Sequence, residues 1–158
     1  MLFSLAGFLS ARSLIEQYIP KPFLKYSEEV MERERQHNPK YADMDARESL
    51  KKSHAKLLHL QSKDDLKVKF ELGTEPLKDA LKECLNCEFV VLDNRGHDPQ
   101  RTIAAAEENK KMLNALNSAK KHLKTQQQIT EFQKGYNWDL ITEQDSEVWD
   151  TIFAFLEK

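Results

Sequence analysis

A change of periodicity between residues 66 and 93 constrains the fold of this chain more than any other feature. Residues 66–72 alternate apolar and polar side chains, which is typical of a strand with one buried face. Residues 77–85 place apolar side chains at helical spacing, and residues 87–92, apolar except at Glu88, are typical of a strand buried on both faces. The pattern predicts a βαβ unit with parallel strands and a right-handed connection.

Helical spacing of apolar residues predicts helices in the rest of the chain. Three are expected before the βαβ unit, over residues 2–19, 23–38 and 46–61, and the later ones over residues 100–125, 129–132 and 146–156. We therefore predict an α+β fold. It is a predominantly helical single domain, residues 1–158, with five or six helices and a βαβ element of two strands near residues 66–93, to which a third strand could be added.

The charge balance argues against a partner recognised by long-range electrostatics. Lys and Arg together number 24 against 26 Asp and Glu, so the formal net charge is only −2. No global field attracts this chain to nucleic acid or to an anionic membrane, and nucleic acid is not an expected partner. We expect the following lysines to form a solvated helix face: Lys110, Lys111, Lys120, Lys121, Lys124 and Lys134.

The first eleven residues are mostly apolar, but they are too few to span a bilayer. They also lack the positive charge that precedes the apolar part of a signal peptide. We expect this segment to be a core helix, with a membrane-surface helix as the alternative. A cytoplasmic protein without a transmembrane span is therefore predicted.

The two cysteines, Cys84 and Cys87, are only three positions apart, so they cannot cross-link distant segments. We expect two buried core cysteines in a reducing compartment. The alternatives are a redox pair or half of a zinc site completed by a histidine, but redox cysteines normally lie at the start of a helix, whereas these follow one. We predict no metal and no cofactor.

A polar loop follows the second predicted strand, at the end where open α/β folds bind ligands. Two carboxylates, two guanidinium groups and an imidazole gather there: Asp93, Arg95, His97, Asp98 and Arg101. The string VVLDNRGH, residues 90–97, resembles a stretch that recurs in α/β-hydrolases. The G-x-S-x-G motif that carries their nucleophilic serine does not occur in this sequence, so the resemblance does not assign the chain to that family.

For function, the sequence favours a protein–protein interaction module without catalytic activity, such as an adaptor, a chaperone, an inhibitor or immunity protein, or a small effector. Only four glycines are present, whereas enzymes of this size usually need glycine-rich backbone close to a ligand. Trp149 and Phe153 share a face of the last helix and are the expected partner surface. The alternative is a small enzyme or a ligand- or metal-binding domain that uses the Asp93–Asp98 loop.

Overall fold

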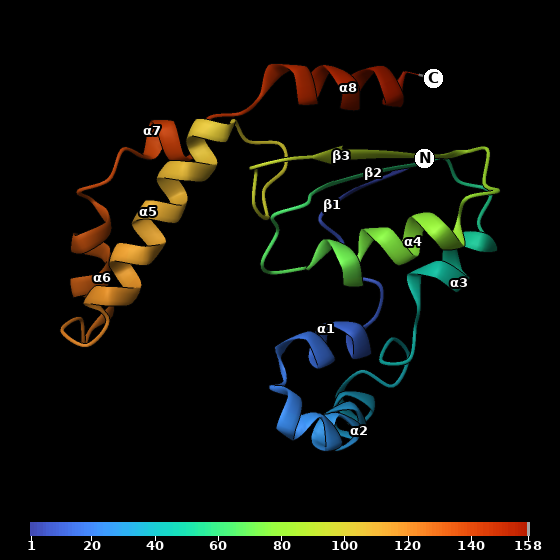
Figure 1. Cartoon of the computed structure of the whole chain (residues 1–158), viewed down its shortest axis with the longest axis horizontal. Helices are drawn as coiled ribbons and strands as arrows, with labels where there is room; N and C mark the ends of the chain where they lie inside the picture. Colours follow the sequence, from blue (N-terminus) through green and yellow to red (C-terminus); the bar gives the residue numbers. More distant parts are fainter. Residues whose placement is uncertain (158) are drawn as a thin grey trace.

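The computed structural model describes residues 1–157, and its α+β fold contains a three-stranded parallel sheet (Figure 1). The strands are β1 (Leu2–Leu5), β2 (Leu57–Ser62) and β3 (Cys87–Leu92), and β2 lies between the other two. Leu57 pairs with Leu2 of β1 and with Cys87 of β3. The three strands therefore start at the same level, and their carboxyl ends point to one edge of the sheet.

Helices fill each connection. Between β1 and β2 lie α1 (Ala11–Tyr18), the 3-10 helix η1 (Lys21–Tyr26), α2 (Ser27–His37) and α3 (Ala46–Lys51). The 3-10 helix η2 (Phe70–Leu72) and α4 (Thr74–Ala80) connect β2 to β3. After β3 come α5 (Ile103–Ala119), α6 (Gln126–Gln133), α7 (Trp138–Ile141) and α8 (Ser146–Leu156). The described residues thus contain eight α-helices, more than the five or six predicted.

The core has two halves, one on each face of the sheet. All six residues of β2 are buried. Leu58 and Leu60 face α8, which contributes the buried side chains Val148, Ile152 and Phe155. On the opposite face, Leu57 packs with Leu9, Leu77 and Leu81. Figure 1 shows α8 on one side of the sheet and α4 on the other, so the central strand is covered by helices on both faces, as parallel sheets require.

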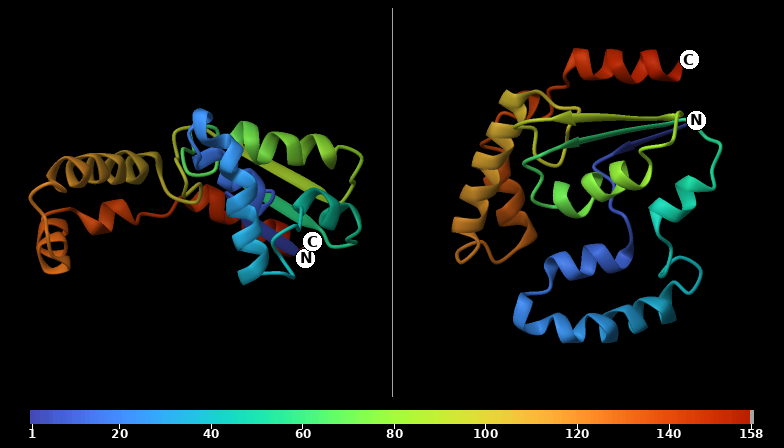
Figure 2. Two further views of the ribbon diagram at one scale, coloured as in Figure 1. Left: turned by 90° about the horizontal axis from the view of Figure 1, so that it is seen from below. Right: turned by 45° about the vertical axis from the view of Figure 1, so that its right-hand side comes forward.

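A helical arm extends beyond the carboxyl ends of the strands. Figure 2 shows α5, α6 and α7 reaching away from the sheet on this side. The base of the arm is tied to the chain that enters α8 by backbone hydrogen bonds from Thr102 to Glu143 (3.1 Å) and from Asp145 to Gln100 (2.9 Å). The loop after β3 therefore lies between the sheet and the arm.

The predicted strand at residues 66–72 is wrong. The carboxylate of Asp65 accepts hydrogen bonds from the backbone N–H groups of Lys67 (2.8 Å) and Val68 (3.0 Å) and folds this segment into a turn. Local side-chain bonds of this kind compete with strand pairing. Leu66 is consequently 78% exposed, and η2 follows directly.

Two segments predicted as helical, residues 2–5 and 57–61, belong to strands instead. Both are short, and periodicity does not distinguish a buried strand of this length from part of a helix. The first and third predicted helices are confirmed only in part, where Ser10 and Asp45 cap α1 and α3. The sheet therefore has three strands rather than two, while its parallel arrangement and the strand β3 are confirmed.

The apolar N-terminal segment also differs from the expected helix. Ala6 adopts a positive φ of 48° after β1 and turns the chain. Ala6 and Leu9 are buried, whereas Phe3 and Phe8 are exposed. Among the described residues, the helices are all too short or too polar to cross a bilayer.

Candidate functional site

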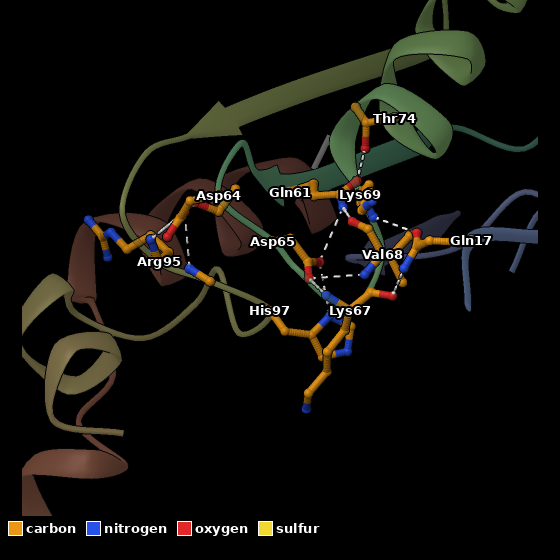
Figure 3. Close-up of polar contacts among 12 residues, drawn as sticks. Gln17, Gln61, Asp64, Asp65, Lys67, Val68, Lys69, Thr74, Arg95 and His97 are labelled. Carbon is orange, nitrogen blue, oxygen red and sulfur yellow. Dashed lines mark hydrogen bonds and ion pairs between the residues drawn. The ribbon is translucent and has the colours of Figure 1, made fainter. Parts of the chain in front are cut away.

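Asp65 and His97 meet at the carboxyl edge of the sheet. Asp65 follows β2 and His97 follows β3, and adjacent parallel strands bring such residues to the same edge. The imidazole Nδ1 of His97 lies 2.9 Å from Oδ2 of Asp65 (Figure 3). The Asp65 side chain is fully buried, whereas that of His97 is 33% exposed. A buried carboxylate thus contacts an imidazole that remains open to solvent.

Four donors surround the carboxylate of Asp65. Oδ1 accepts the backbone N–H groups of Lys67 and Val68, and Oδ2 accepts the amide Nε2 of Gln61 (3.2 Å) as well as His97. Because an ionised carboxylate only accepts hydrogen bonds, the hydrogen between Asp65 and a neutral His97 lies on Nδ1. The second ring nitrogen, Nε2, then carries the lone pair, which is the arrangement of a general base.

Asp64 fixes the backbone of the loop that carries His97. Its Oδ1 accepts the backbone N–H groups of Arg95 (3.1 Å) and Gly96 (3.2 Å) and the hydroxyl of Ser62. Burial raises the pKa of Asp64, but these hydrogen bonds outweigh it and leave the pKa below its ordinary value. Gly96 has a φ of 62°, in the left-handed region that favours glycine. The two features together set the path of the loop just before His97.

A cavity of about 390 Å³ opens beside His97, between the loops after β2 and β3 and one face of α5. Its size lies within the range of small-molecule sites. Acidic, basic, amide and apolar side chains all contribute to its walls, among them Asp64, Leu66, Lys67, Arg95, His97, Asp98, Arg101, Asn109, Lys110 and Leu113. A ligand in this cavity would lie against the imidazole.

Arg95 ties the loop to the helix α8. Its Nη1 lies 2.6 Å from Oδ2 of Asp145, and the two side chains are only 13% and 17% exposed. The hydrogen bond from Arg95 lowers the pKa of Asp145, which also accepts the backbone N–H groups of Glu147 and Val148 at the start of α8. The guanidinium of Arg95, one of the predicted loop residues, is therefore engaged in a contact within the chain.

The other predicted loop residues have varied surroundings. Asp93 is exposed and pairs with Lys63 at 3.3 Å. Asp98 and Arg101 pair at 3.5 Å and line the cavity, and Arg101 also donates to the carbonyl of Ile141 (3.2 Å). Of the five candidates, His97, Arg95, Asp98 and Arg101 thus lie around one cavity, and Asp93 does not line it.

Sequence analysis missed the two adjacent carboxylates, Asp64 and Asp65. Their signal was present, because only Lys63 separates them from the end of β2, where polar residues mark the carboxyl end of a strand. Since residues 57–61 were predicted as part of a helix, Asp64 and Asp65 were not expected at a strand end.

The two cysteines are not free thiols: Cys84 and Cys87 form a disulfide between α4 and β3. Both are half-buried at the edge of the core cluster of Leu57, Leu77 and Leu81, so the expected pair of fully buried thiols is wrong. Within residues 1–157, no group of three or more His, Cys, Asp or Glu side chains is arranged to hold a metal ion.

The two residues of the predicted partner surface have different surroundings. Trp149 packs against the core cluster beneath α8, and its indole N–H donates to Oε1 of Gln144 at 3.1 Å. Phe153 is 53% exposed, and its ring lies 5.7 Å from that of Trp149. Only Phe153 therefore offers a largely free aromatic surface.

Among these sites, the Asp65–His97 pair is distinguished by a buried carboxylate, an accessible imidazole and an adjoining cavity. In comparisons with known proteins, no family model matches the sequence, and neither a curated protein nor a solved structure gives a match.

Proposed function

We propose that this chain carries out acid–base chemistry in a hydrolytic reaction, with His97 as the general base and Asp65 as the carboxylate that orients it. The observation that carries the proposal is the 2.9 Å contact between Nδ1 of His97 and the buried Oδ2 of Asp65, next to a cavity. A neutral imidazole held in this way presents Nε2 to a ligand.

The chemistry follows from the protonation states. Nε2 of His97 takes a proton from an O–H group in the cavity, and the oxygen attacks an electrophilic carbon of the substrate. The imidazolium that forms is stabilised by the negative charge of Asp65 and then returns its proton to the leaving group. None of the described residues that line the cavity is Ser, Thr or Cys, so the attacking oxygen belongs to water or to a hydroxyl group that enters the cavity.

The order of the two residues supports a hydrolytic reaction. In α/β-hydrolases the orienting acid precedes the histidine in the chain, as Asp65 precedes His97. Because the G-x-S-x-G motif does not occur in the sequence, the proposal takes from that family only the Asp–His pair.

The test is hydrolysis of p-nitrophenyl acetate by the purified chain and three variants. We expect His97→Ala to abolish the rate above buffer, and Asp65→Asn to lower it by about 100-fold or more, because the asparagine stabilises the wrong tautomer. Asp93→Asn is the matched control, since this exposed carboxylate lies on the same loop but pairs with Lys63. Equal rates for the native chain and His97→Ala would reject the proposal.

We propose, as a second function, binding of another protein through the outer face of α8. The supporting observation is the exposure of two large apolar side chains on that helix, Phe153 (53%) and Leu156 (43%). Aromatic side chains of this kind are enriched at protein interfaces. A partner isolated with the native chain should be lost with Phe153→Asp and retained with Thr151→Asp, an exposed position on the same helix. Equal retention by both variants would exclude this surface.

A further inference from the structure

A chain of buried polar side chains leads through the interior to Asp65. His59 and Gln61 lie two positions apart on β2, and Thr74 is the first residue of α4. All three are at most 1% exposed. Nε2 of His59 lies 2.6 Å from Oγ1 of Thr74. The Thr74 hydroxyl bonds to Oε1 of Gln61, and Nε2 of Gln61 reaches Oδ2 of Asp65 at 3.2 Å, as Figure 3 shows.

The donor and the acceptor of each hydrogen bond in this series of buried side chains can be assigned. Nε2 of Gln61 faces two groups that only accept, the Asp65 carboxylate and the carbonyl of Val68, so the amide cannot be turned around. Its Oε1 must then accept the single hydroxyl hydrogen of Thr74. The Thr74 oxygen is left to accept from His59, whose hydrogen therefore lies on Nε2. Every donor points toward Asp65.

The protonation of His59 agrees with this direction. Burial lowers the pKa of His59 to about 4, so the ring is neutral near pH 7 and has one N–H to donate. The chain of bonds thus has one consistent assignment of hydrogens at neutral pH.

Gln61 also holds the turn that surrounds Asp65. By donating to the carbonyl of Val68, it fixes the segment whose N–H groups bind Oδ1 of the same carboxylate. From the outer side, Gln17 of α1 donates to the carbonyl of Lys67 (2.6 Å) and accepts the N–H of Lys69 (2.9 Å). The turn is therefore held from inside by Gln61 and from outside by α1, as Figure 3 shows.

We propose that Gln61 is a positioning residue for the acid–base pair, and that Thr74 and His59 hold its amide oxygen in place from the side away from Asp65. The inference rests on the proposed function of Asp65 and His97. Gln61 contacts one carboxylate oxygen directly and the other through the turn, so it determines where the carboxylate receives the imidazole.

The test measures His97 itself and needs no substrate. NMR of ¹⁵N-labelled histidine identifies the tautomer of His97, and the rate of carbethoxylation by diethyl pyrocarbonate, read by mass spectrometry, reports the reactivity of its Nε2. The exposed His54 and His122 provide internal reference rates. In the native chain we expect the tautomer with the hydrogen on Nδ1.

We expect Gln61→Met to shift the equilibrium between the two tautomers of His97 by about tenfold, the ratio that corresponds to one lost hydrogen bond to a charged group, and to slow its carbethoxylation in proportion to the lost population of the Nδ1–H tautomer. Thr74→Val should act in the same direction, and Thr74→Ser should restore native behaviour because it keeps the hydroxyl. If Gln61→Met does not fold, the comparison of Thr74→Val with Thr74→Ser tests the positioning role instead. Leu60→Val, on the opposite face of β2, is the control for a general loss of stability.

The outcomes separate the two proposals. If Asp65→Asn changes the tautomer and rate of His97 but the folded Gln61→Met and Thr74→Val variants leave both at native values, Gln61 does not position the pair. If Asp65→Asn itself changes neither quantity, the proposed function of the pair is wrong. A slower reaction of His97 in Leu60→Val equal to that in Gln61→Met would assign the effect to stability and would also overturn the positioning role.

Discussion

Arg95 and Asp145 join two parts of the chain that are 50 residues apart, through a hydrogen-bonded ion pair of 2.6 Å with both side chains largely buried. Arg95 lies two residues before His97, and Asp145 caps α8. The same contact therefore anchors the loop of the candidate site and the helix that covers one face of the sheet.

Replacing Arg95 should destabilise the protein more than a surface ion pair would. Arg95→Met leaves Asp145 without its guanidinium partner, and we expect the free energy of unfolding to fall by about 2 kcal/mol. Urea denaturation of the variant measures this change. Asp93→Asn, which removes an exposed pair with Lys63, should change it by less than about 0.5 kcal/mol. Similar losses in the two variants would contradict the role of the buried pair.

The stability of the protein should depend on pH through His59. Its pKa is about 4 in the folded chain and about 6.5 when unfolded, so the unfolded state binds more protons between these values. The contribution of a neutral His59 is complete above the unfolded pKa and is lost as the pH falls from 6.5 to 4, by up to about 3 kcal/mol. Urea unfolding at pH 7 and pH 4.5 measures the loss. His59→Gln, which does not titrate, should remove this part of the pH dependence, and an unchanged dependence would refute it.

A larger side chain at Gly96 should have enough room, but it should strain the backbone. Its φ is 62°, and a Cβ added there would have no heavy atom within 4 Å. Gly96→Ala should therefore cost about 1 kcal/mol of stability from backbone strain alone. Gly96→Asn, which accepts the left-handed region more readily, should cost less. Thermal unfolding ranks the two variants, and an asparagine variant less stable than the alanine one would show that crowding, not φ, decides.

The sequence was informative where one periodicity applied over enough residues. The helix α8 was predicted, as was the strand β3, because each combines a clear pattern with a clear boundary. The strand β2 was missed because Leu57 and Leu58 also continue the helical spacing that starts at residue 46, so a strand of six residues was taken for the end of a helix. The run at 66–72 failed for another reason, since the bonds of Asp65 to its own backbone override the alternation of side chains.

Prediction of the candidate site from the sequence was also only partly successful. His97 was selected because it follows a recognised strand, but its partner Asp65 depends on the pairing of β2 with β3, a contact between segments about 30 residues apart. Gln61 and Thr74 carry no sequence signal for a site, because a buried amide and hydroxyl acquire a role only from the groups they contact. Such residues can be identified as part of a site only once the register of the sheet is known.

The orientation of α8 can be tested with two phenylalanines two positions apart. Phe155 is 2% exposed and packs against Leu58 and Leu60, whereas Phe153 is 53% exposed. Phe155→Ala should lower the free energy of unfolding by about 3–4 kcal/mol, because it removes a buried ring and leaves a cavity. Phe153→Ala should change it by less than about 0.5 kcal/mol, since surface substitutions rarely do more. Urea denaturation of the two variants provides the comparison. If Phe153→Ala proved as costly as Phe155→Ala, α8 would be turned differently on the sheet, and Phe153 would no longer be available to a partner.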